Sequence, residues 1–103
     1  MVIVAGVFTM DPGQREAFLD GRKAVMAHSR AEKGCIEYTF SADPLEPGRV
    51  VLFERWESQE DLDVHLAGLS AGSAPAVTGP EAATTWIVIY DVSGERLLRR
   101  SPE

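Results

Sequence analysis

Four runs of β-forming residues, separated by two segments of helical periodicity, constrain the fold of this chain more than any other feature of its sequence. The β-type runs cover residues 2–10, 35–42, 49–56 and 84–92, and the helical segments cover residues 12–33 and 58–69. A β-α-β-β-α-β order is typical of a ferredoxin-like α+β protomer, in which two helices pack on one face of an antiparallel sheet. We therefore predict one such domain over residues 1–94, followed by a tail at 95–103.

The first helical segment has a start signal and a stop signal at its two ends. Asp11 can cap a helix whose first turn holds Pro12. Gly34 follows Lys33, where such a helix would stop. These signals predict a single continuous helix that runs from Pro12 to Lys33.

The second helical segment opens with a capping box, in which Ser58 is followed three residues later by the acidic Asp61. Leu62, His65 and Leu69 then recur at the spacing of one helix face. We expect this helix to end near Leu69, before a loop rich in glycine, proline and small residues. The same spacing predicts that the His65 imidazole points inward.

Alternation identifies which faces of the strands are buried. The run at 35–42 places Ile36, Tyr38 and Phe40 on one side and polar residues on the other, which predicts a half-buried strand. The run at 84–92 is apolar on both sides, with Trp86 on one face and Ile87 on the other, so both faces should be covered. Two copies stacked sheet to sheet would cover the face without helices, and we therefore predict a homodimer.

Composition excludes several classes of protein. Sixteen acidic residues against ten basic ones give a net charge of −6, and no cluster of lysine and arginine points to nucleic acid. No apolar run approaches the roughly 20 residues of a membrane helix, and the first residues lack a signal-peptide layout, so we expect a cytoplasmic protein. Cys35 is the only cysteine, and its separation from His28 and His65 predicts no metal site.

His65 is the side chain most suited to chemistry, because an inward imidazole can act as a general base. The alternative is a buried histidine held by hydrogen bonds alone. Trp56 could wall a pocket for a flat ligand or simply belong to the core, and Tyr38 could donate a hydrogen bond to a ligand oxygen. The acidic residues from Glu54 to Asp63 are interpreted as a solvated helix start.

Two segments carry a family resemblance. Residues 31–38 read Ala-Glu-Lys-Gly-Cys-Ile-Glu-Tyr, and residues 53–58 read Phe-Glu-Arg-Trp-Glu-Ser, with His65 nine residues after Trp56. Both segments resemble the antibiotic biosynthesis monooxygenase (ABM) domain family of dimeric α+β barrel proteins. The resemblance covers residues 2–69 and the fourth strand. It implies a homodimer of ferredoxin-like protomers with a pocket between each sheet and its helices.

The resemblance also implies a chemistry. Members of the family oxidise hydroquinones, anthrones and related phenols to quinones with molecular oxygen, without flavin or metal. By this analogy the partners are a small aromatic substrate and oxygen, no cofactor is needed, and His65 assists deprotonation of the substrate. Trp56, Tyr38 and Arg55 are then the expected substrate-binding residues.

Some family features are missing. The chain has no asparagine, which the haem-degrading branch uses in its pocket, and it lacks the proline-histidine segment that many relatives carry after the second helix. Haem degradation is therefore disfavoured. Two alternatives to oxidation stay open: a non-catalytic dimeric binding or accessory module, and an oxygen-independent isomerase or cyclase on the same fold.

Overall fold

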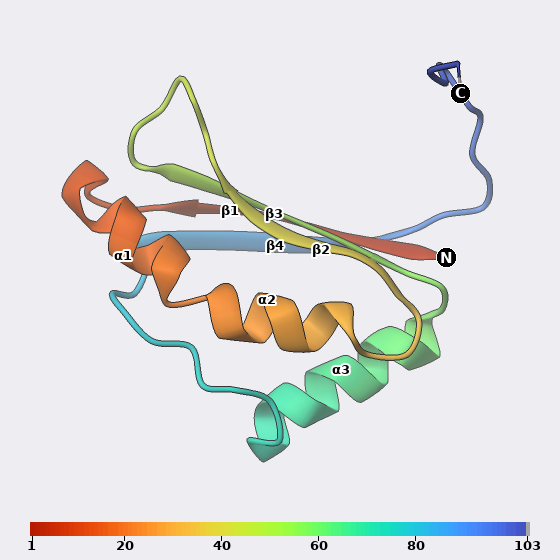
Figure 1. The fold of residues 1–103 in the computed structure, drawn as a ribbon, viewed down its shortest axis with the longest axis horizontal. Helices are drawn as coiled ribbons and strands as arrows, with labels where there is room; N and C mark the ends of the chain where they lie inside the picture. Colours follow the sequence, from red (N-terminus) through yellow and green to blue (C-terminus); the bar gives the residue numbers. More distant parts are fainter. Residues whose placement is uncertain (103) are drawn as a thin grey trace.

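The computed structural model describes residues 1–102, which form a four-stranded antiparallel sheet with the helices on one face (Figure 1). The strands are β1 (Val2–Thr9), β2 (Cys35–Ala42), β3 (Arg49–Trp56) and β4 (Thr84–Asp91), in the spatial order β2-β3-β1-β4. The helical elements are a 3₁₀ turn η1 (Pro12–Gln14), α1 (Arg15–Asp20), α2 (Lys23–Arg30) and α3 (Gln59–Ala71). The predicted ferredoxin-like α+β fold is confirmed. None of the helices within residues 1–102 has the length and apolar character that a membrane span requires.

The central strands alternate strictly between a buried and a half-buried face. On β1 the residues at even positions from Val2 to Phe8 are buried against the helices. On β3 the same face holds Val50, Leu52 and Trp56. The antiparallel register pairs Val2 with Trp56 and Gly6 with Leu52, so the two buried rows form one surface that is apolar except at Glu54.

The prediction of one helix from Pro12 to Lys33 is wrong, because that segment is divided into α1 and α2 at Gly21 and Arg22. The carbonyl of Gly21 accepts a hydrogen bond from the backbone N–H of Thr78, at 3.1 Å. A Cβ atom at Gly21 would lie 1.9 Å from the Thr78 carbonyl oxygen, so only glycine permits this approach. The loop that follows α3 therefore inserts where the helix breaks.

The helix α3 begins with the predicted cap but ends later than predicted. The Ser58 hydroxyl accepts a hydrogen bond from the backbone N–H of Asp61. The helix continues two residues beyond Leu69, to Ala71, and Gly72 closes it in the left-handed conformation with φ +74°.

The strand β2 has the predicted bounds and an unpredicted irregularity. A bulge between Cys35 and Glu37 shifts the pairing with β3, so Cys35 lies opposite Trp56 and packs against the core. Ile36 is 40% exposed and lies outside both core clusters, contrary to the prediction that it shares a face with Tyr38 and Phe40.

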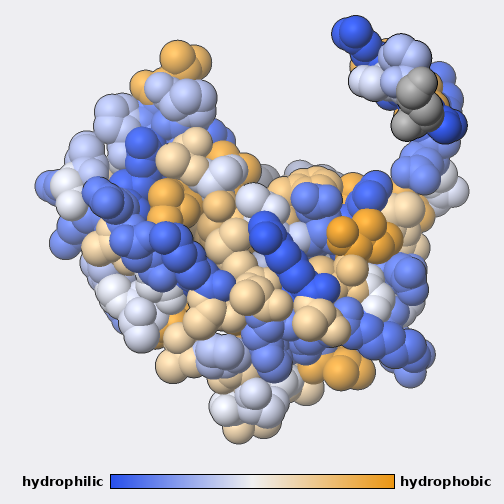
Figure 2. Space-filling view, in the orientation of Figure 1, coloured by the Kyte–Doolittle hydropathy of each residue, from blue (hydrophilic) through white to orange (hydrophobic). Residues whose placement is uncertain are grey.

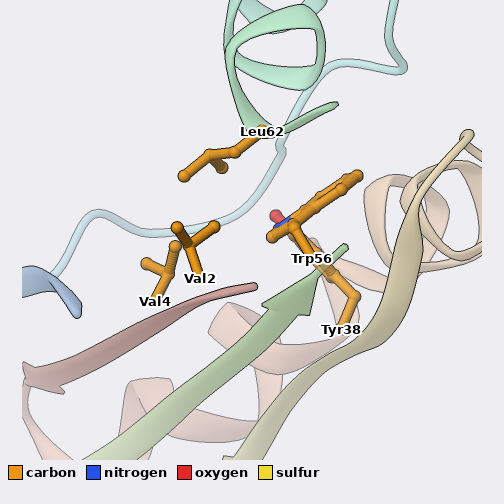
Figure 3. Packing of buried hydrophobic residues seen from close by; sticks show 5 residues of the cluster. All are labelled: Val2, Val4, Tyr38, Trp56 and Leu62. Carbon is orange, nitrogen blue, oxygen red and sulfur yellow. The ribbon is translucent and has the colours of Figure 1, made fainter. Parts of the chain in front are cut away.

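Two apolar clusters fill the space between the sheet and the helices. One lies beneath α3 and the other beneath α1. Figure 3 shows the first cluster, in which Leu62 of α3 faces the β1 valines and Trp56. The buried members are Val2, Val4, Tyr38, Trp56 and Leu62 in the first cluster, and Phe8, Met10, Phe18, Val50 and Leu52 in the second.

Strand β4 pairs only with β1 and lies at the edge of the sheet. The prediction that both of its faces are covered does not hold within one chain, because Trp86 is 60% exposed and Ile87 is 48% exposed. On its inner side Ile87 and Ile89 line the same space as α3 yet stay about half exposed, and its outer side belongs to the sheet face without helices (Figure 1). After Val92 the chain leaves the sheet and stands clear of the body of the molecule (Figure 2).

Candidate functional site

A cavity of about 280 Å³ lies between the inner face of the sheet and the helices. Its walls come from all four strands, from α3, from the junction between α1 and α2, and from the loop after α3. Most lining side chains are apolar, and the polar ones are Arg22, Tyr38, Glu54 and His65. An apolar cavity with a few polar groups is the usual form of a small-molecule site.

His65 is 2% exposed, and its Nδ1 lies 2.6 Å from Oε1 of Glu32. An ionised carboxylate can only accept, so Nδ1 donates to Glu32, and in the neutral imidazole the lone pair then lies on Nε2. Glu32 lies beyond the end of α2 and takes no part in lining the cavity, whereas His65 does. The pair thus combines a cavity-lining imidazole with a carboxylate that fixes its orientation.

Trp56 supports this histidine from within the core. Its side chain is fully buried and does not line the cavity. The indole lies 4.8 Å from the His65 ring, centroid to centroid, and its Nε1–H donates to Oε1 of Glu54 at 3.0 Å. The indole therefore holds both an imidazole and a carboxyl group in place.

Glu54 is buried, contrary to its interpretation as part of a solvated helix start. It stands between Leu52 and Trp56 on the inner face of β3 and is 5% exposed. Burial raises the pKa of the Glu54 carboxyl above its ordinary value, and the hydrogen bond from Trp56 opposes that rise only in part. This carboxyl is a titratable group in the cavity that our sequence analysis did not identify.

Tyr38 lies beside the histidine, with the two ring centroids 5.4 Å apart. Its side chain is buried and lines the cavity. Burial, helped by the negative charge of Glu54, raises the pKa of the Tyr38 phenol well above its usual range. The phenol is therefore a hydrogen-bond donor over the whole physiological pH range.

Arg55 is not brought together with the other predicted site residues. It follows Glu54 on the strand and so projects from the opposite, outer face of the sheet. Its Nε is buried without a partner, and a terminal nitrogen lies 3.9 Å from the largely exposed Glu95 carboxylate. In one protomer the sheet separates Arg55 from the cavity.

Three cavity-associated residues, Arg22, Glu32 and Glu54, were missed by our sequence analysis. Glu54 had a signal, because it occupies an apolar-face position in the alternation of β3. Arg22 had none, because it enters the cavity at a helix break that depends on the distant Thr78. Within residues 1–102, no three or more histidine, cysteine or acidic side chains are placed to hold a metal ion.

Comparisons with known proteins agree with this architecture. A family model described as antibiotic biosynthesis monooxygenase matches residues 1–71. The "Putative monooxygenase YcnE" of Bacillus subtilis is 28% identical over 65 residues, which is 63% of this chain and 68% of that protein. An uncharacterized protein of Synechocystis is 34% identical over 65 residues, again 63% of this chain but only 44% of the longer relative.

A solved structure has the same fold. The crystal structure titled as a "putative antibiotic biosynthesis monooxygenase" from Deinococcus radiodurans superposes with a TM-score of 0.76. The alignment covers 98% of this chain and all of that one, at 21% sequence identity. The shared architecture therefore extends through β4, beyond the residues that the family model matches.

Proposed function

Because this chain belongs to the antibiotic biosynthesis monooxygenase family, we propose that it is a monooxygenase that oxidises a phenolic or polycyclic aromatic compound to a quinone. The substrate is of the hydroquinone or anthrone type, the oxidant is molecular oxygen, and the proposed reaction uses neither flavin nor metal. The observation that supports this proposal is the Glu32–His65 pair, which directs a basic imidazole to an apolar cavity.

In the proposed reaction Nε2 of His65 removes a proton from the substrate. Moving a proton from a phenol with a pKa of about 10 to an imidazole of about 6.5 costs roughly 5 kcal/mol. The Tyr38 hydroxyl is suited to offset part of this cost by donating to the developing oxyanion. His65 is thus the proposed catalytic base and Tyr38 the proposed substrate-binding donor, while Trp56 and Glu32 position the imidazole.

The electron-rich anion then reduces oxygen directly. For an anthrone, the reacting methylene carbon loses two hydrogens and gains one oxygen atom as the new carbonyl. The second oxygen atom leaves with those two hydrogens as water, so atoms and electrons balance. Arg55 has no part in this step because it projects from the other face of the sheet.

Oxygen uptake by the metal-stripped protein, with a panel of hydroquinones and anthrones, tests the proposal. His65→Ala is expected to lower turnover by roughly 100-fold or more if His65 is the general base. His28→Ala is the matched control, since His28 is a half-buried histidine on α2 that does not line the cavity. Uptake that is equal in both variants, or no uptake with any compound, would contradict the proposal.

An oxygen-independent isomerase or cyclase is the second candidate, and the buried Glu54 favours it. Glu54 and His65 both line the cavity, so one group could remove a proton and the other return it at another carbon. Anaerobic assays separate the two reactions, because only oxidation stops without oxygen. A non-catalytic binding module would bind the same aromatic compounds and convert none of them.

A homodimer is part of the proposal, because the outer face of the sheet is apolar and uncovered. Val7 pairs with Val51 on one side and Trp86 on the other, and Ala5 pairs with Phe53 and Val88 in the same way. Both rows lie on the face without helices. Stacking two such faces would remove this apolar surface from water.

A further inference from the structure

The side chain of Arg22 sits in an aromatic surround at the α1–α2 junction. Its Cζ lies 3.3 Å from the centroid of the Phe18 ring, 5.6 Å from that of Phe40 and 5.9 Å from that of Phe8. One terminal nitrogen donates to the Phe18 carbonyl oxygen at 3.1 Å. The guanidinium is thereby held flat against phenylalanine at the wall of the cavity.

Arg22 has no anionic partner within the described part of the chain. Among residues 1–102, no carboxylate lies within ion-pair distance of its guanidinium, although Lys23 next to it pairs with Asp20 on the surface. Burial lowers the pKa of Arg22, as expected for a guanidinium that is partly removed from water without a carboxylate beside it. A guanidinium presents five N–H donors in a fork that matches a carboxylate.

The position of Arg22 relative to His65 sets the distance between the two polar ends of the cavity. Phe40 neighbours Arg22, and Tyr38 neighbours His65. Side chains two residues apart on a strand are separated by about 7 Å. A ligand that contacts both ends therefore needs its two polar groups roughly one or two rings apart.

The size of the cavity gives the same limit. A cavity of about 150 Å³ holds one benzene molecule, and this one has about 280 Å³. One ring or two fused rings fit, and a larger polycycle would have to extend through the uncovered side at β4.

We propose that the cavity selects an aromatic substrate with an ionised carboxylate, which Arg22 binds while the reacting hydroxyl or methylene faces His65. This inference rests on the proposed function only for the identity of the reacting group. The anion requirement itself concerns binding, so it can be tested without turnover.

The test compares 2-naphthoate with its neutral isostere 2-naphthamide by isothermal titration calorimetry. We expect the wild-type protein to bind the carboxylate about 10-fold or more tightly than the amide, the preference of a partly desolvated guanidinium–carboxylate pair. Arg22→Gln should bring the ratio of the two affinities close to 1. Lys23→Gln, which removes the neighbouring exposed charge, should leave the ratio unchanged.

Equal affinity for the two probes in the wild-type protein, a preference that survives Arg22→Gln, or no binding of either probe would overturn the inference. Thermal melting reports whether Arg22→Gln is folded. If Arg22→Gln is unfolded, Arg22→Met is used in its place, because it keeps an apolar stem against Phe18. Oxygen uptake is measured separately, so a missing anion preference and a missing oxidation are distinguishable.

Discussion

Oε1 of Glu32 lies 2.6 Å from Nδ1 of His65, so a carboxylate just beyond the end of α2 sets the tautomer of an imidazole on α3. Glu32→Gln keeps the shape of the side chain and removes its charge. We expect turnover to fall by roughly 10-fold or more, because the amide can present its NH₂ group to Nδ1 and favour the unproductive tautomer. Steady-state kinetics over a range of pH measure this effect.

Glu37→Gln is the control for that variant, since Glu37 is an exposed carboxylate on β2. It should retain wild-type turnover. If Glu32→Gln were as active as Glu37→Gln at every pH, the carboxylate would have no role in orienting His65. A loss of thermal stability in step with the loss of activity would point instead to a purely structural pair.

The buried carboxyl of Glu54 should make stability depend on pH. The unfolded side chain ionises near its ordinary pKa of 4.5, and burial raises the pKa in the folded state. Between these two values the folded chain binds more protons than the unfolded chain, so the free energy of unfolding falls as pH rises. The penalty grows as the pH rises through this window and disappears below the unfolded pKa.

Glu54→Gln replaces the carboxyl group with an amide that does not ionise, and the amide oxygen can still accept the hydrogen bond from Trp56. The variant should therefore gain stability over wild type as the pH rises: the difference between the two free energies of unfolding, variant minus wild type, should be larger at pH 7 than at pH 4. The difference is about 1.4 kcal/mol for each pH unit by which burial raises the pKa. Urea titrations at the two pH values measure it, with Glu37→Gln as the exposed control. A difference independent of pH would show that Glu54 titrates as an exposed group does.

Gly21→Ala should destabilise the fold although alanine is the better helix former. The gain in helix propensity is about 1 kcal/mol, but the new Cβ would lie 1.9 Å from the Thr78 carbonyl oxygen. We expect a net loss of roughly 1 to 3 kcal/mol as the loop after α3 is displaced. Gly68→Ala is the control within α3, where the Cβ meets only the Ser73 hydroxyl oxygen, at 3.2 Å. Denaturant unfolding should give opposite signs for the two variants, and equal signs would refute the argument.

Val88→Lys places a charge in the middle of the apolar outer face, opposite Ala5 of β1. If that face is the dimer interface, light scattering at micromolar concentration should report a dimer for wild type and a monomer for the variant. Leu45→Lys is the control, because Leu45 is 89% exposed in the β2–β3 hairpin. A monomeric wild-type protein would rule the dimer out.

The sequence predicted correctly those strand and helix limits that depend on neighbouring residues alone. The alternation of residues 35–42 and 49–56 gave β2 and β3 their observed limits, and Ser58 caps α3 as its hydroxyl allows. His65 was placed correctly on the inward face of its helix. The division between a domain ending at residue 94 and a tail stays a prediction.

Distant contacts explain what the sequence could not show. The break at Gly21 depends on Thr78, which approaches only after the whole α3 segment has folded back. Glu54 looked solvated among its acidic neighbours, although the alternation of β3 places it on the buried face, where the Trp56 indole donates to it. The cover of the outer face of β4 was expected from a second copy, and that expectation stays a prediction.

The cavity draws its walls from two parts of the chain, one inside and one outside the stretch that the family model matches. The proton-handling residues Glu32, Glu54 and His65 all fall within the stretch 1–71 that the family model matches. Val77 and the β4 isoleucines, which complete the apolar wall, lie beyond it. The part of the apolar wall that lies beyond residue 71 can therefore be exchanged without touching His65 or Arg22, and a chimera that takes only the last third of the chain from a relative should change which ring systems fit while preserving the chemistry and the carboxylate preference.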